Sequence, residues 1–228
     1  MKIKVLIKIL LLITGGLCVA SKAIQLPELE FYAKPATMPL FFMLYWFSTK
    51  RVDIPFLVVL FLSFLVDIFL LTGIEDSFLY VLICNSVCYS ILFYFLFKIF
   101  RPIDFSNTDI IYLIIFFVGW TFIVYTFYDE VRYGLGDLLI YGAIYTLVLY
   151  FLLIGAVLHY VNVRSTKSLW FLIAILNFFI SDSCYALDAF YISSVEFRVM
   201  NSLYQFLAIF FLVQFKISSS TVLKLKEF

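Results

Sequence analysis

The sequence of 228 residues contains little charge and few residues that favour turns. Only 14% of the residues are charged, 65% are apolar, and there are 8 glycines, 5 prolines and one histidine. Soluble domains are about 25% charged and about 45–50% apolar, so a water-soluble globule is excluded. The net charge of +1 provides no basic surface for nucleic acid. We therefore expect a protein whose partner is membrane lipid, not nucleic acid.

Several sequence motifs of enzymes are absent. The chain has no glycine-rich phosphate loop, no His-Glu-x-x-His and no Gly-x-Ser-x-Gly, which are typical of nucleotide binding, zinc proteases and serine hydrolases. All four cysteines lie in apolar stretches without the spacing of a disulfide framework or a zinc site. We therefore expect no metal and no cofactor.

Apolar stretches recur along the whole chain at about 20 residues, the length of helix that crosses the hydrocarbon of a bilayer. They run approximately over residues 4–20, 34–49, 54–72, 77–99, 108–128, 135–160, 168–188 and 196–217. The stretches are too long for barrel strands and lack their alternation of apolar and polar residues. The sequence predicts an all-α, polytopic membrane bundle of about eight transmembrane helices, as a single integral membrane domain over residues 1–228.

The distribution of basic residues predicts the orientation of these helices. With the N-terminus inside the cell, twelve of the sixteen Lys and Arg residues fall on the cytoplasmic side, so we expect both termini to be cytoplasmic. Residues 1–23 also resemble a cleavable signal peptide, whose removal would leave seven spans. The expected location is the plasma (inner) membrane of a bacterium.

Two carboxylates fall deep inside predicted spans. Asp67 lies 13 residues beyond Ile54, and Asp182 lies 14 residues beyond Ser168. At 1.5 Å per residue, each rises about 20 Å from the inner surface, which places both in the outer half of the membrane. Because ionisable groups are costly in hydrocarbon, such residues are candidates for function, although either could instead be a structural partner of Lys34.

Other polar residues lie near the same predicted depth, several of them spaced to share a helix face. They are Lys34, Asn85, Tyr89, Tyr141, Tyr145, Ser181, Asn201, Tyr204 and Gln205. Pro35 and Pro39 are expected to distort the start of the second span beside Lys34, and irregular backbone at this depth favours a cavity. The pattern predicts one polar cavity open to the outer leaflet, shared by both carboxylates.

Four stretches resemble the YhhN-like lysoplasmalogenase family of eight-span membrane proteins. They are Lys34-Pro35 with Met38-Pro39, Ser63 to Asp67, Phe178 to Asp182, and Tyr204-Gln205. The chain departs from the family pattern at Val66 and Ala174, where glycine is usual, and at Cys88, where histidine is usual. The resemblance therefore indicates a divergent member.

The resemblance implies hydrolysis of the vinyl ether bond of lysoplasmalogens, which releases a fatty aldehyde and a glycerophospho head group. On this interpretation Asp67 and Asp182 are the catalytic pair: one protonates the vinyl carbon, and the other stabilises the oxocarbenium ion and activates water. Lys34 would neutralise the substrate phosphate or keep one carboxylate ionised. The remaining polar residues of the predicted cavity would bind a lysophospholipid-like substrate.

Two other classes of protein remain open. A non-enzymatic lipid-binding protein or transporter would use the same cavity, but the residues below it are mainly Phe, Leu, Ile and Val, which argues against a polar path through the membrane. An intramembrane aspartyl protease would also use two aspartates. Its Tyr-Asp and Gly-x-Gly-Asp motifs are not found at Asp67 and Asp182, which follow Val66 and Ser181.

Overall fold

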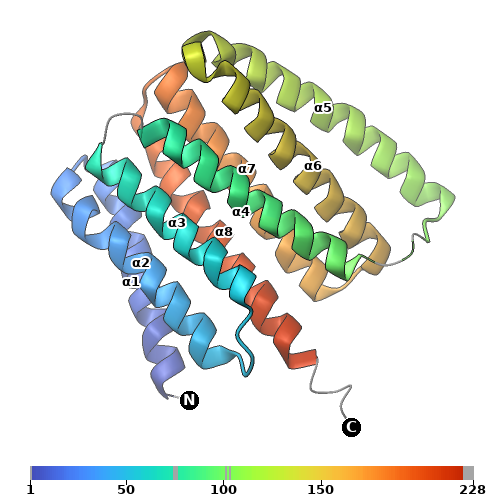
Figure 1. The fold of residues 1–228 in the computed structure, drawn as a ribbon, viewed down its shortest axis with the longest axis horizontal. Coiled ribbons are helices and arrows are strands. Elements are labelled where there is room, and N and C mark those ends of the chain that lie inside the picture. Colours follow the sequence, from blue (N-terminus) through green and yellow to red (C-terminus); the bar gives the residue numbers. More distant parts are fainter. Residues whose placement is uncertain (1, 74–76, 101, 103, 223–228) are drawn as a thin grey trace.

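The computed structural model describes residues 2–73, 77–100, 102 and 104–222, and this part of the chain is helical with no strand (Figure 1). The helices are α1 (Lys2–Ala23), α2 (Pro27–Ser48), α3 (Ile54–Thr72), α4 (Ser77–Ile99), α5 (Asn107–Leu135), η1 (Gly136–Leu138), α6 (Leu139–Val163), α7 (Thr166–Phe190) and α8 (Val195–Val222). Each apolar stretch predicted from the sequence falls mainly on one of the α-helices. The predicted boundary between the fifth and sixth stretches was wrong: α5 continues to Leu135, and η1 precedes α6. The predicted start of the second helix was wrong: α2 begins at Pro27, so Lys34 lies inside the helix and not at its start.

Most of these helices are long and apolar enough to cross a membrane. Six stretches among the described residues meet this description, and one of them, from Asn107 to Val163, contains both α5 and α6. Among the α-helices, α2 is not one of these stretches; its most apolar part still contains Lys34 and the two internal prolines, Pro35 and Pro39. The protein is therefore a multi-pass integral membrane protein. The cytoplasmic position of both termini stays a prediction, and Arg101, Lys224 and Lys226, which support it, lie outside the described residues.

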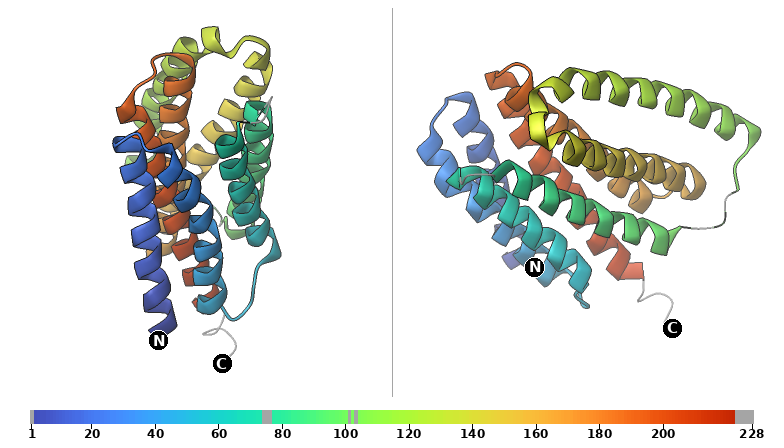
Figure 2. Two further views of the ribbon diagram at one scale, coloured as in Figure 1. Left: turned by 90° about the vertical axis from the view of Figure 1, so that its left-hand side faces the viewer. Right: turned by 45° about the horizontal axis from the view of Figure 1, so that its top comes forward.

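Seven of the helices close into a ring. In this ring α1 packs on α2, and contacts continue through α3, α4, α6, α7 and α8, which returns to both α1 and α2. α5 lies outside the ring, against α6 and α7 (Figures 1 and 2). α1 begins and α8 ends at the same end of the bundle (Figure 2). The C-terminal ends of α1, α3, α5 and α7 therefore gather at the opposite end, which we call the loop end.

Local sequence explains several helix ends. Ser106 and Asp109 form a capping box at the start of α5, and Ser165 and Ser168 form another at the start of α7. These side chains satisfy backbone N–H groups that have no partner inside the helix. α3 ends at Gly73, whose φ of 57° suits a residue without a Cβ atom. Polar residues or glycine between the apolar stretches thus fix these three helix ends.

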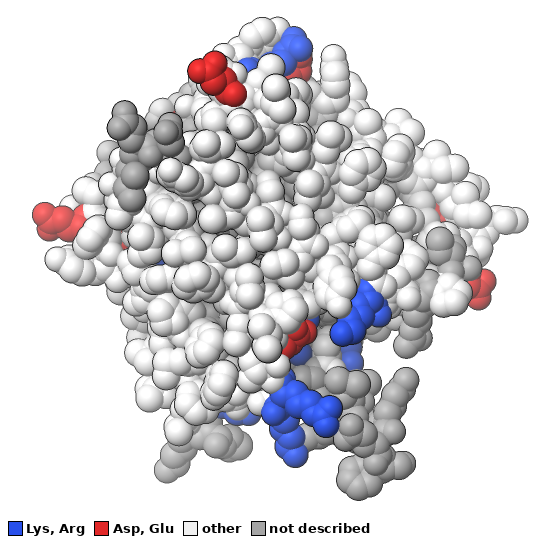
Figure 3. All heavy atoms as spheres, in the orientation of Figure 1, with Lys and Arg blue, Asp and Glu red and all other residues white. Residues whose placement is uncertain are grey.

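The interior of the ring is filled by apolar side chains from every helix of the ring, among them Phe41, Leu92, Phe171 and Leu212, each 0% exposed. At Gly155 of α6, an added Cβ atom would lie 2.5 Å from the end of the Leu96 side chain of α4, so a larger residue here would force Leu96 to move. The outer surface is apolar as well: the face seen in Figure 3 is almost free of charge, with Lys, Arg, Asp and Glu mainly near its edges.

Candidate functional site

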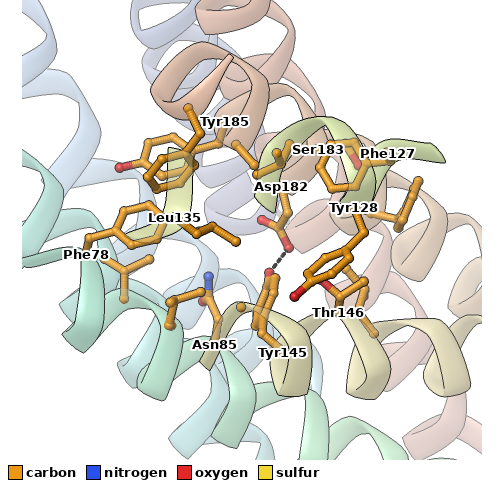
Figure 4. Close-up of a pocket in the computed structure, with 18 residues that line it drawn as sticks. Phe78, Asn85, Phe127, Tyr128, Leu135, Tyr145, Thr146, Asp182, Ser183 and Tyr185 are labelled. Carbon is orange, nitrogen blue, oxygen red and sulfur yellow. Dashed lines mark hydrogen bonds between the residues drawn. The ribbon is translucent and has the colours of Figure 1, made fainter. Parts of the chain in front are cut away.

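Asp182 is held by two tyrosines from neighbouring helices. It lies on α7, and the phenols of Tyr89 on α4 and Tyr145 on α6 both donate hydrogen bonds to its Oδ2 atom. The two phenol oxygens are themselves 3.4 Å apart. Neither tyrosine bonds Oδ1, and Figure 4 shows this second oxygen turned away from Tyr145, toward Leu135. Among the described residues, Tyr89 and Tyr145 are the hydrogen-bond donors to Asp182, so Oδ2 is held by the protein and Oδ1 is open to contact another molecule.

That free oxygen faces a small apolar cavity, which we call the aspartate cavity. Its volume is about 70 Å³, and its walls come from α4, α5, α6 and α7. Most of the lining side chains are apolar, and Asn85, Tyr145 and Thr146 supply polar atoms beside Asp182 (Figure 4). Such a space holds a few water molecules or a short part of a hydrocarbon chain.

Asp67 lies in a separate polar cluster. Asp67 lies on α3 and is only 1% exposed. The Nζ atom of Lys34 on α2 lies 3.3 Å from Asp67 Oδ1, and Gln205 on α8 donates a hydrogen bond of 3.1 Å to the same oxygen. Glu30 lies 4.0 Å from Lys34 and 2.7 Å from Lys22. Because Asp67 is both paired with a cation and hydrogen-bonded, the cost of burying its charge is offset.

Lys34 also lines a larger polar cavity, which we call the lysine cavity. Its volume is about 350 Å³. Its charged lining residues are Lys22, Lys34, Arg198, Glu30 and Asp188. Tyr185 lines both this cavity and the aspartate cavity, so the two cavities are neighbours that share this side chain. The lysine cavity, which has charged residues of both signs, thus adjoins the mainly apolar aspartate cavity.

The structure places the two aspartates in different hydrogen-bonded clusters, whereas the sequence predicted one shared cavity. Asp182 lines the aspartate cavity, whereas Asp67 is not among the lining residues of that cavity or of the lysine cavity. The reason is the order of the ring: α3 packs on α2 and α4, whereas α7 packs on α6 and α8. Depth along a helix was readable from the sequence, but depth does not determine which neighbour each carboxylate faces.

The other predicted site residues are divided between these clusters and the surrounding packing. Tyr89, Tyr145 and Asn85 lie with Asp182, and Lys34 and Gln205 lie with Asp67. Ser181 and Asn201 bond each other: the amide of Asn201 donates to the carbonyl and hydroxyl oxygens of Ser181, both at 3.0 Å, which joins α7 to α8.

Two predicted residues take no part in either cluster. Tyr141 is 49% exposed and lines neither cavity. Tyr204 is half-buried and is likewise absent from both linings. Among the described residues, no three His, Cys, Asp or Glu side chains are grouped closely enough to hold a metal ion.

Sequence reasoning missed Glu30, Lys22 and Arg198, which surround the lysine cavity. Glu30 is four residues before Lys34 on α2, a spacing that brings two side chains together on a helix. This signal was hidden because the predicted second span began at residue 34. A longer second helix would have placed Glu30 beside Lys34.

The fold and these clusters define a class of protein: a multi-pass membrane protein of packed helices that buries charged groups among its helices. The model of the YhhN family matches residues 29–221, and the chain belongs to the YhhN family. No curated protein and no solved structure matches the chain. The matched range contains both aspartates and all the side chains that bond them.

Proposed function

We propose that this protein is a hydrolase that cleaves the vinyl ether bond of lysoplasmalogen-type lipids. The products are a fatty aldehyde and a glycerophospho head group. The observation that carries the proposal is Asp182, with one oxygen held by two phenols and the other facing an apolar cavity. Membership of the YhhN family supports the same activity, which the sequence resemblance implies.

The arrangement around Asp182 suits acid–base catalysis by one carboxyl group. The protonated Oδ1 atom donates its proton to the vinyl carbon beyond the one that is bonded to oxygen, which leaves an oxocarbenium ion and the Asp182 carboxylate. The phenols of Tyr89 and Tyr145 stabilise the negative charge that remains on Asp182. In a cavity with few competing waters, these hydrogen bonds act strongly.

Water completes the reaction. A water molecule attacks the carbon of the oxocarbenium ion, and Asp182 accepts its proton, which restores the acid. The hemiacetal then collapses: its hydroxyl proton moves to the glycerol oxygen, the bond between carbon and that oxygen breaks, and the aldehyde forms. One water is consumed, and no metal or cofactor takes part.

In this proposal Asp67 is not the second catalytic carboxylate, which revises the mechanism expected from the sequence. Its contacts with Lys34 and Gln205 make it a positioning residue for Lys34. Lys34, Lys22 and Arg198 in the lysine cavity suit a phosphate, and Glu30 and Asp188 suit the ammonium group of ethanolamine or choline. A zwitterionic head group in this cavity would place the adjoining ether linkage toward Tyr185 and Asp182.

The test uses purified protein with lysoplasmalogen and with its saturated alkyl-ether analogue, and detects released aldehyde. We expect aldehyde from the vinyl ether alone, and a loss of about 10³-fold or more in Asp182→Asn. Asp137→Asn is the matched control, because Asp137 is an exposed carboxylate in η1, outside both cavities. Vinyl ether turnover that survives in Asp182→Asn would reject this mechanism.

A non-enzymatic lipid-binding protein is the second candidate. It is favoured by the buried ion pair between Asp67 and Lys34, because such a pair needs no catalytic role. If neither substrate releases aldehyde while the saturated analogue binds, the protein is a lipid-binding protein and the hydrolase proposal fails.

A further inference from the structure

We propose that the seam between α5 and α6 is the path by which the hydrocarbon chain of a single-chain lipid reaches Asp182, and the site where that chain rests. This inference depends on the proposed function for the identity of the lipid, but binding of the chain is measurable without turnover. The lipid enters sideways from the bilayer, and its chain stays in the seam while its head group occupies the lysine cavity.

The first support is a groove that continues the aspartate cavity. The groove is lined by Thr121, Val124, Tyr125, Tyr128, Ala143, Thr146, Leu147 and Tyr150, and its volume is about 350 Å³. Tyr128 and Thr146 line both this groove and the aspartate cavity. A chain in the groove therefore leads directly to the space beside Asp182.

The second support is the direction of the groove. Along α5, the aspartate cavity is lined by residues 127–135, nearest the loop end, and the groove by residues 121–128. From Val131 to Thr121 the helix descends about 15 Å, toward the middle of the span. A lipid with its head group at the loop end would point its chain in this direction.

The third support is the position of α5 in the bundle. α5 lies outside the ring and packs only on α6, α7 and the short helix η1 (Figures 1 and 2). Its buried residues are few for a helix of 29 residues: Trp120, Val124, Val131 and Leu135. Of the four helices around the aspartate cavity, α5 is therefore the most loosely packed, and a helix held by few contacts separates from its neighbour more easily.

The chemistry of the groove identifies its occupant. Its lining contains no charged residue, and the polar atoms that it has are hydroxyl groups of Thr and Tyr. The hydroxyls of Thr121 and Tyr150 lie 2.7 Å apart and join α5 to α6 at the lower end of the groove. With these hydroxyls satisfied, the wall offers mainly apolar contact, which suits a hydrocarbon chain and not a charged solute.

The decisive experiment is photolabelling with an alkyl-ether lysophospholipid that carries a diazirine in the middle of its chain. This probe has no vinyl ether and is not hydrolysed. We expect the labelled peptides, identified by mass spectrometry, to contain residues 121–128 and 143–150, and the label to disappear when an excess of unlabelled probe competes. Labels confined to other helices, or labels that do not compete, would overturn the proposal.

A matched pair of variants tests the path itself. Ala143→Trp fills the groove, whereas Ile144→Trp alters the next residue, which is 53% exposed and lines neither the groove nor the aspartate cavity. We expect Ala143→Trp to lower labelling by about tenfold, as for the loss of two methylene contacts, and Ile144→Trp to leave it within about twofold. Equal effects of the two variants would contradict the path.

The results also separate the two proposals. Labelling of the groove in a protein that releases no aldehyde supports the chain path and rejects the hydrolase. Aldehyde release that depends on Asp182, without labelling of the groove, supports the hydrolase and rejects the path. Asp182→Asn is expected to keep the label, because it changes the acid and leaves the groove intact.

Discussion

Loss of the Lys34 ammonium should destabilise the protein more than loss of the Asp67 charge. At the observed separation of 3.3 Å, the attraction between the two charges is about 5 kcal/mol for an effective dielectric constant near 20. Lys34→Met leaves the Asp67 carboxylate buried, with Gln205 as its remaining partner, which costs about 3–5 kcal/mol. Asp67→Asn costs about 1–2 kcal/mol, because Lys34 still lies 4.0 Å from Glu30.

The double variant, Lys34→Met with Asp67→Asn, should recover part of the loss, because no unpaired carboxylate remains. The assay is thermal unfolding in detergent for the wild type, both single variants and the double variant. We expect Lys34→Met to lower the midpoint by about 10 °C and the double variant to lie above it. If the effects of the two single variants simply add, the ion pair does not couple these residues and the reasoning is wrong.

Three further outcomes are expected. Tyr145→Phe should lower vinyl ether turnover by about 10²-fold through the lost hydrogen bond to Asp182, while Tyr141→Phe, at an exposed position, leaves kcat unchanged; equal losses would contradict the assigned contact. Gly155→Leu should lower the unfolding midpoint by several degrees, since its side chain collides with α4, and an unchanged midpoint would count against that close packing. Lys216→Met should destabilise by about 2 kcal/mol in denaturant unfolding, because Lys216 loses its ion pair of 2.7 Å with a carboxylate on the loop before α3; a loss that disappears at high salt would place the pair in solvent.

The sequence predicted the helical class and the approximate positions of the helices, because the thickness of the bilayer sets the length of an apolar stretch that crosses it. It also singled out Asp67 and Asp182 as candidates for function, because an ionisable side chain inside a membrane span is energetically costly. The pairing of Lys34 with Asp67 was considered as a structural alternative, and the structure confirms that contact.

The sequence did not predict which residues share a cavity. Asp182 meets tyrosines of α4 and α6, whereas Asp67 meets side chains of α2 and α8, and these neighbours follow from the order of the helices in the ring. A periodic pattern shows which face of a helix is polar, but it does not show which other helix packs against that face. Lys22 was missed for a similar reason: α1 reaches Glu30 only because α1 and α2 pack as a hairpin.

The closure of the ring by α8 has a consequence for biosynthesis. Gln205 bonds Asp67 of α3, and Lys216 bonds the Asp53 side chain just before α3, so early helices depend on the last of the described helices. Contacts so distant in sequence form late, and until then the half-assembled chain holds Asp67 without its amide partner. A ribosome that stalls before α8 would leave an assembly open to membrane quality-control proteases, and completion of the chain would itself be the step that protects it.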